Sequence, residues 1–201
     1  MAGLLSNLRN TLIVSFLLAL VLVAGYGMHD GSASQIFWQG VFRWLHTLFG
    51  IMWIGLLYYF NFVQIRKMPE IPAELKPAVS KFIAPEALFW FRWAALLTWV
   101  MGVILAINRG YLVEAFTLGA MDGFQIAQHS FIGVGMWLAT VMFINVWAFI
   151  WPAQKIALGI KEGDAAAKAA AGRKAMLFSR INTLLSVPML VTMTMNQTIF
   201  G

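Results

Sequence analysis

Five long apolar segments run through the chain, at residues 10–28, 38–65, 86–108, 123–151 and 176–198. Each is long enough to cross a bilayer core of about 30 Å as an α-helix, which takes about 20 residues. The strands of a membrane barrel would instead be about 10 residues long with strict alternation. The pattern therefore predicts an all-α integral membrane protein with five transmembrane helices, and residues 1–201 as a single transmembrane domain.

The composition supports the same class. Hydrophobic residues make up 61% of the 201 residues and charged residues only 11%, whereas a soluble domain has about 25% charged residues. A net charge of +6 would indicate nucleic acid in a soluble protein, but here the basic residues lie between apolar segments. No nucleic-acid partner is expected. The absence of cysteine excludes disulfides, iron–sulfur clusters and covalent c-type haem attachment.

The basic residues also predict the orientation in the membrane. They concentrate in the segments 66–85 and 152–175, whereas 29–37 has none and 109–122 has only Arg109. The residues counted are Arg66, Lys67, Lys76, Lys81, Lys155, Lys161, Lys168, Arg173 and Lys174. Since basic loops stay inside, we expect a bacterial inner-membrane protein with a cytoplasmic N-terminus and a periplasmic C-terminus.

The first apolar segment can be interpreted as a signal peptide or as a retained transmembrane helix. Arg9 followed by an apolar run to Ala24 and Gly25 resembles a secretory signal peptide, whose removal would leave four helices in the same orientation. The run continues through Tyr26 and Met28 without a clean small-x-small cleavage site. We therefore expect a retained helix.

Two of the three histidines lie inside apolar segments. His29 is expected to be solvated, whereas His46 and His129 lie eight and seven residues from the outer ends of their segments. At the rise of an α-helix, both would sit roughly 10–12 Å below the outer boundary. Two histidines at matched depth suit axial ligation of one iron in a helical bundle. We predict haem b with His46 and His129 as the iron ligands.

The residues around these histidines support that prediction. Gly50 and Gly133 each follow a histidine by four residues, which leaves room on the same helix face for a flat macrocycle. Arg43 lies one turn before His46 and could pair with a haem propionate, and Trp53 would provide an apolar wall. Alternatively, the histidines form interhelical hydrogen bonds and the glycines are packing notches. Zinc would need more ligands than these two histidines.

A second set of polar residues lies nearer the cytoplasmic ends of the segments. Its members are Asn61, Gln64, Arg92, Asn145, Ser179, Arg180, Asn182 and Ser186. Helix packing, with Arg92 extending to the interface, is favoured over a polar pocket for a quinone or a small anion. Pro188 is expected to kink the last helix.

Residues 45–64 and 179–190 resemble the N-terminal membrane domain of bacterial membrane-bound urate hydroxylases, the urate oxidase N-terminal family. More distantly, the last four segments resemble four-helix haem-b membrane proteins of the protoporphyrinogen oxidase and copper-resistance D types. In those proteins a histidine near the start of one helix is followed by the pattern Trp-x-Gly. The corresponding residues of this sequence are His46, Trp53 and Gly55, and residues 97–102 resemble the second helix of the same group. The resemblance implies a haem-type four-helix bundle and oxidoreductase activity similar to urate hydroxylation.

Urate hydroxylases of this family continue into a longer membrane part and a C-terminal cytochrome c, whereas this sequence ends at Gly201. The resemblance therefore implies an integral membrane haem-b redox protein that passes electrons to a separate periplasmic cytochrome c. The alternative is a non-enzymatic accessory subunit of a larger respiratory or photosynthetic membrane complex, or a homo-oligomer. A transporter is less well supported, because the five segments show no repeat.

Overall fold

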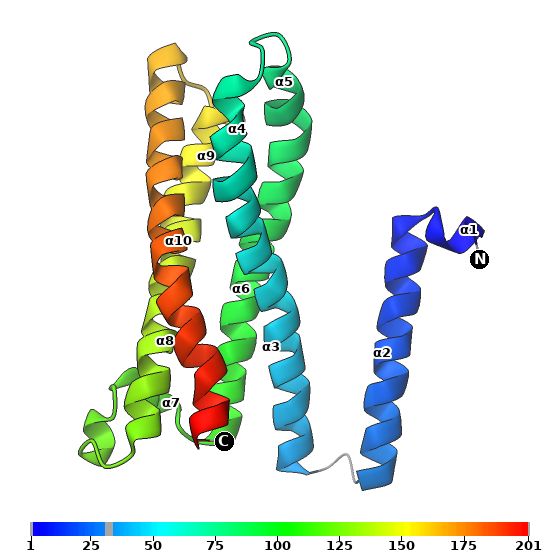
Figure 1. Ribbon diagram of the computed structural model, residues 1–201, viewed down its shortest axis with the longest axis vertical. Helices are drawn as coiled ribbons and strands as arrows, with labels where there is room; N and C mark the ends of the chain where they lie inside the picture. Colours follow the sequence, from blue (N-terminus) through cyan, green and yellow to red (C-terminus); the bar gives the residue numbers. More distant parts are fainter. Residues whose placement is uncertain (1, 31–33, 201) are drawn as a thin grey trace.

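The computed structural model describes residues 2–30 and 34–200, and this part of the chain is helical without any strand. Five helices are long and apolar enough to span a membrane, as the sequence predicts. They are built around α2 (Leu8–Asp30), α3 (Gln35–Tyr58), α6 (Ala84–Arg109), α8 (Ala127–Ile144) and α10 (Ala165–Phe200) (Figure 1). A short α1 (Ala2–Leu5) precedes them.

Several of these helices extend beyond the apolar segments through short elements. After α3 come the π-helix η1 (Tyr59–Gln64), α4 (Ile65–Lys67) and the 3-10 turn η2 (Met68–Glu70). Before α6 come α5 (Lys76–Ala78) and the π-helix η3 (Val79–Ile83), and α8 continues through the π-helix η5 (Asn145–Ile150) and α9 (Trp151–Ala157). The basic segments are therefore mostly helical, and the Ala-rich stretch is the first part of α10.

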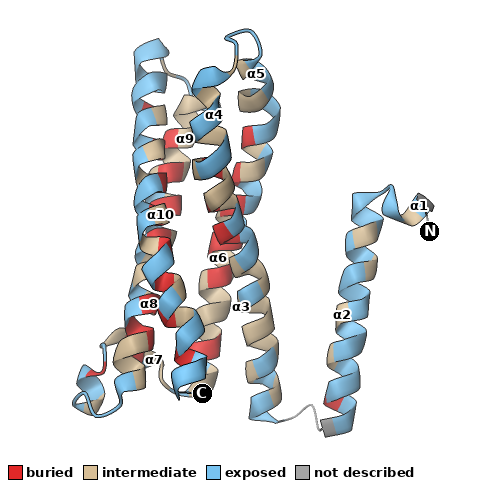
Figure 2. Cartoon of the chain, viewed as in Figure 1, coloured by how far each residue is buried: buried red, intermediate tan, exposed pale blue. Residues whose placement is uncertain are grey.

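Helices α3, α6, α8 and α10 form a bundle, in which α3 packs closely on α6 and α8 packs closely on α10 (Figure 1). The core of large buried side chains fills the half of the bundle nearer the basic segments (Figure 2). Its most buried members include Trp53, Leu57, Phe91, Met142 and Val146. The direction of α10 changes along its C-terminal part (Figure 1), as Pro188 inside the helix predicts.

Helix α2 lies beside the bundle and is separated from it over most of its length (Figure 1). Most of its described residues are exposed (Figure 2). The rings of Tyr26 and Phe37 stack at 6.3 Å near the connection between α2 and α3. His29 lies in the last turn of α2 and is exposed.

At the end of the bundle opposite the basic segments, α7 (Leu112–Phe116) and the 3-10 turn η4 (Ala120–Asp122) lie beside the start of α8 (Figure 1). Here the predicted start of the fourth helix at residue 123 is wrong, because Gly123 and Phe124 have φ values of 64° and 63°, which an α-helix cannot contain. Helix α8 begins at Ala127 instead. His129 therefore lies in its first turn, not two turns inside it.

Candidate functional site

A cavity of about 650 Å³ lies between the α3/α6 pair and the α8/α10 pair. Its volume falls within the range of about 300–1,000 Å³ that is typical of small-molecule and cofactor sites. Four of the predicted site residues line it together, all of them from α3: Arg43, His46, Gly50 and Trp53. Helices α6, α8 and α10 supply the other walls, and methionines of α8 and α10 are among the lining residues.

His46 is fixed in this wall by α6. Its Nδ1 lies 2.8 Å from the backbone carbonyl oxygen of Thr98; since a carbonyl only accepts, Nδ1 carries the proton and Nε2 keeps a free lone pair. The ring rests on Gly102, where an added Cβ would lie 2.9 Å from both Cε1 and Nδ1 of His46. Histidines that bind metals are usually oriented by such a hydrogen bond through the other ring nitrogen.

His129 lies outside the cavity lining. Its Nδ1 pairs with the carboxylate of Asp122, and its ring lies 6.1 Å from the ring of Tyr111, which does line the cavity. Gly133 is also absent from the lining, and a Cβ added there would collide with the carbonyl oxygen of Ala115 in α7. Gly133 is thus a notch for helix packing, the alternative that the sequence left open.

Arg43 and Arg109 make one end of the cavity positively charged. Both side chains line it, and the positive charge of each acts to lower the pKa of Tyr111, which lies between α6 and α7. Among the described residues neither arginine has an ion-pair partner, and Nε of Arg43 is buried without a hydrogen bond. Burial raises the pKa of the Tyr111 phenol, against the opposite effects of Arg109 and Arg43, so Tyr111 is neutral at ordinary pH.

Two further polar atoms on the cavity wall are buried without a hydrogen-bond partner. They are Nε1 of Trp53 and Oδ1 of Asn196. Buried polar groups are normally satisfied, and an unpaired one costs roughly 1–3 kcal/mol. Together with Nε of Arg43, these atoms give the cavity two donors and one acceptor that have no hydrogen-bond partner. A site that binds a ligand with polar groups at its edge would contain such atoms.

Part of the second polar set lies close together in the half of the bundle nearer the basic segments. Asn61 Nδ2 donates to Ser179 Oγ at 2.8 Å, and the Tyr58 hydroxyl lies 3.0 Å from Ser186 Oγ. Asn145 Nδ2 donates to Asn182 Oδ1 at 2.8 Å. Packing of η1, η5 and α10 thus accounts for most of the set.

The two arginines of that set lie elsewhere. The Arg92 guanidinium lies 3.9 Å from the ring centroid of Trp151 and 5.2 Å from that of Phe89, and Arg180 is exposed. Cation–π contact with aromatic rings accounts for the position of Arg92 in an apolar segment.

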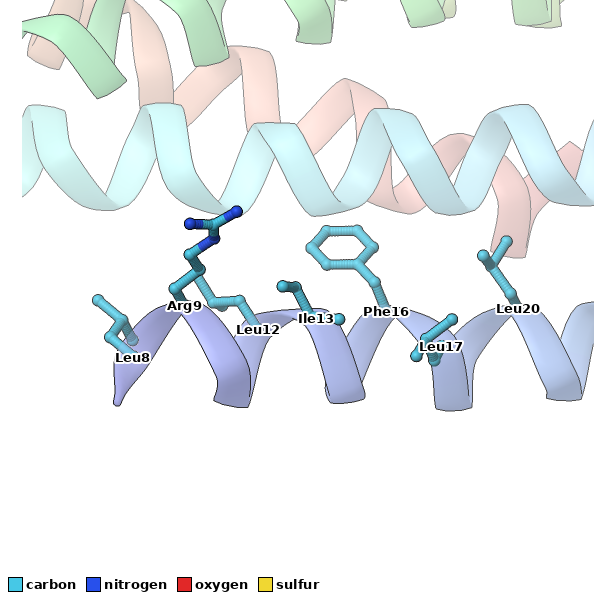
Figure 3. Close-up of a pocket in the computed structure, with 7 residues that line it drawn as sticks. All are labelled: Leu8, Arg9, Leu12, Ile13, Phe16, Leu17 and Leu20. Atoms are coloured by element: carbon cyan, nitrogen blue, oxygen red, sulfur yellow. The ribbon is translucent and has the colours of Figure 1, made fainter. Parts of the chain in front are cut away.

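A second hollow lies along α2, and its lining residues follow one another along the helix: Leu8, Arg9, Leu12, Ile13, Phe16, Leu17 and Leu20 (Figure 3). In the close-up, Arg9, Phe16 and Leu20 extend toward the neighbouring helix of the bundle (Figure 3). Its wall is almost entirely apolar and offers no titratable group except Arg9. Over the described residues there is also no group of three or more His, Cys, Asp or Glu side chains that could hold a metal ion.

Sequence reasoning missed the residues of α6 and α7 that complete the cavity: Thr98, Gly102, Arg109 and Tyr111. One signal was available for Arg109, because it is the only basic residue of the segment 109–122, on the side where basic residues are rare. Thr98 and Gly102 lie in the stretch 97–102 that resembles a helix of haem-b proteins, but their contacts with His46 depend on the packing of α3 on α6.

The comparisons with known proteins bear on the second half of the chain. Residues 111–200 match the model of the family described as urate oxidase N-terminal. This segment includes α7, α8, α10 and the resembling stretch 179–190, whereas His46 and the stretch 45–64 precede it. No curated protein and no solved structure matches the chain. The chain is therefore similar to the urate oxidase N-terminal family over residues 111–200, which is less than half of its length.

Proposed function

We propose that the cavity binds haem b and that the protein is a membrane redox protein. The observation that carries this proposal is the arrangement of His46. Its Nδ1 is held by the Thr98 carbonyl and its ring lies on the wall of a cofactor-sized cavity, so Nε2 would be free to hold the iron of a bound haem. Haem b would supply one-electron chemistry, which the side chains of this chain cannot.

The other cavity residues fit the chemical character of haem b. Arg43 and Arg109 would bind the two propionate carboxylates, which would also give the unpaired Nε of Arg43 an acceptor. Trp53 and the methionines would contact the apolar faces of the macrocycle. The shortage of protein metal ligands is no obstacle, because the porphyrin itself provides the remaining iron ligands.

His129 is proposed as the second iron ligand, as the sequence predicts. Its Nδ1 is anchored by Asp122, which leaves Nε2 free in the same way as in His46. Because His129 lies outside the cavity lining and its ring lies 6.1 Å from the ring of Tyr111, which does line the cavity, binding through His129 would need a rearrangement of this region. If this ligation occurs, His129→Ala converts a low-spin spectrum into a high-spin one.

The family suggests urate as the electron source, with a periplasmic cytochrome c as the acceptor. Membranes that contain the protein would then consume urate only when an oxidised soluble cytochrome c is supplied. No consumption under those conditions would leave a haem protein that carries electrons from another donor.

The accessory-subunit alternative rests on a different observation, the separation of α2 from the bundle (Figure 1). Its apolar face toward the bundle (Figure 3) could contact another membrane subunit. A mass measurement of the complex extracted in mild detergent tests this alternative, because extra polypeptides would be retained only if α2 has such a partner.

The proposal of haem binding is tested by the absorption spectrum of the purified protein before and after dithionite. We expect a Soret band and, on reduction, the sharp visible bands of a b-type haem. A protein that is folded and helical but colourless, also after incubation with haemin, would contradict the proposal.

A further inference from the structure

Two basic side chains share the ring of one tryptophan at the surface of the bundle. The Arg92 guanidinium of α6 lies 3.9 Å from the ring centroid of Trp151, and the Lys155 ammonium lies 5.7 Å from that ring. Trp151 and Lys155 belong to α9, in the half of the bundle nearer the basic segments (Figure 1). We refer to these three residues as the Trp151 site. Because both cations contact one ring, both are within reach of a single bound anion.

Neither cation of the Trp151 site is neutralised by the part of the chain that the structure describes. Within residues 2–30 and 34–200, neither Arg92 nor Lys155 has an ion-pair or hydrogen-bond partner. Glu86, the acidic residue nearest to Arg92 in the sequence, instead accepts a hydrogen bond from Nε1 of Trp90 at 2.8 Å. Contact with an aromatic ring leaves the N–H groups at the edge of a guanidinium without acceptors. An anion from outside the chain can supply those acceptors.

The surface of α6 around Arg92 is apolar and faces outward. Phe89 and Trp93 are each 41% exposed, and their rings lie 6.4 Å apart. The Arg92 guanidinium lies 5.2 Å from the Phe89 ring. Since α6 belongs to a helix that is long and apolar enough to span a membrane, these rings would face acyl chains. Arg92 lies about 9 Å along the helix from Glu86, and an arginine at such a depth extends toward the headgroups.

The chemistry of the Trp151 site suits the phosphodiester of a lipid. A planar guanidinium binds two phosphate oxygens side by side, and an ammonium adds a point charge. Indole rings favour the level at which headgroups meet acyl chains. Basic pockets between helices on the cytoplasmic side of a membrane bind anionic headgroups. A lipid also covers the exposed rings of Phe89 and Trp93, which a free phosphate ion would leave uncovered.

We propose that the Trp151 site binds one anionic phospholipid. Arg92 and Lys155 contact its phosphodiester, and the indole of Trp151 lies against its glycerol backbone. One acyl chain follows Phe89 and Trp93 along α6 toward the middle of the membrane. None of these residues lines the cavity, so the proposal does not depend on the proposed redox function.

Native mass spectrometry of the purified, delipidated protein in mild detergent tests the proposal. The protein is titrated with dioleoylphosphatidylglycerol or with dioleoylphosphatidylcholine, which has the same acyl chains and phosphodiester but no net charge. The intensities of the lipid-free and the one-lipid species give the affinity for the first bound lipid. We expect the wild type to bind phosphatidylglycerol at least about tenfold more tightly than phosphatidylcholine.

Variants of the two cations locate the binding. Arg92→Gln should lower the affinity for phosphatidylglycerol about tenfold and leave that for phosphatidylcholine unchanged. Arg92→Lys keeps the charge but loses the planar fork, so its loss should be smaller. Lys155→Gln should also weaken binding, and less so in the Arg92→Gln background than in the wild type, because both cations contact the same lipid.

Arg180→Gln is the matched control for net charge. Arg180 is an exposed arginine of α10, and the structure gives it no contact with an aromatic ring. Its replacement removes the same charge as Arg92→Gln and should leave the affinity for phosphatidylglycerol unchanged. An equal loss in Arg180→Gln and Arg92→Gln would show a general effect of charge and would overturn the proposal.

The remaining outcomes separate a lipid from a free anion. Equal affinity of the wild type for the two lipids would overturn the proposal, and so would a preference for phosphatidylglycerol that survives in both Arg92→Gln and Lys155→Gln. A second titration replaces ammonium acetate by ammonium phosphate at equal ionic strength. We expect unchanged lipid binding, whereas displacement of the lipid would assign the site to free phosphate. If Arg92→Gln fails to fold, Arg92→Lys and Lys155→Gln still decide the question.

Discussion

At the scale of single residues, the position of His46 depends on a glycine that faces it from another helix. Gly102 leaves the space for the imidazole ring, and Thr98 supplies the carbonyl that orients it. The sequence allowed His46 to be predicted as a ligand because a histidine in an apolar helix is costly and rare. It could not reveal Thr98 and Gly102 as its partners, because contacts between helices about fifty residues apart leave no periodic signal.

Gly102→Ala is predicted to weaken haem binding. The added methyl group would lie 2.9 Å from the His46 ring, so the ring must shift and its bond to Thr98 must lengthen. Haem titration should show an affinity lower by at least about tenfold, equivalent to 1.4 kcal/mol. Gly40→Ala, where an added Cβ meets nothing within 4 Å, is the control, and an equal effect of both changes would contradict this role.

The two arginines are predicted to raise the reduction potential. Positive charge near the iron favours the reduced state, which carries one more negative charge. Arg43→Gln and Arg109→Gln should therefore each lower the potential, by on the order of 30–60 mV, and weaken retention of haem. Lys155→Gln, far from the cavity lining, should leave the potential unchanged in a spectroelectrochemical titration. A potential that rises in either arginine variant would show that these arginines do not face the cofactor.

At the scale of elements, hydropathy predicted the five helices but not their ends. The helices continue into the basic segments because alanine, lysine and arginine, which are frequent in the Ala-rich stretch, favour helix, although the charged residues end the apolar segment there. The start of α8 was misplaced because residues 123–126 are apolar enough to extend the segment, although Gly119 and Gly123 adopt positive φ. Read as turn signals, these glycines could have placed the helix start correctly.

The contact between η5 and α10 is predicted to contribute strongly to stability. Asn182 is fully buried, accepts from Asn145 and donates to the carbonyl of Met142 at 2.9 Å. Asn182→Leu should lower the free energy of unfolding by about 1–3 kcal/mol, because Asn145 loses its acceptor. The midpoint of thermal unfolding in detergent measures this loss. Asn10→Leu on exposed α2 should cause almost none, and an unchanged midpoint in both variants would contradict the prediction.

At the scale of the whole molecule, the bundle consists of two closely packed helix pairs that separate around the cavity. Such a division follows from contacts between pairs of helices, which single-sequence patterns do not specify. The charge of the connecting segments, in contrast, predicts the orientation directly.

The orientation is predicted to place the segment 158–164 in the cytoplasm and Gly201 in the periplasm. Alkaline phosphatase fused after Gly201 should be active, because it folds only outside the cytoplasm, and green fluorescent protein inserted in 158–164 should fluoresce. The reverse pattern would place the Arg43 end of the cavity on the cytoplasmic side and would exclude a periplasmic electron acceptor.

If His46 holds haem in the cavity as proposed, the variant His46→Ala should lose its haem. The measurement is the amount of haem b per purified polypeptide, compared with the wild type and with His29→Ala, which changes an exposed histidine of α2. We predict haem b in a one-to-one ratio in the wild type and in His29→Ala, and its loss from His46→Ala in a protein that keeps its helical content. Full haem content with an unchanged spectrum in His46→Ala would contradict the account.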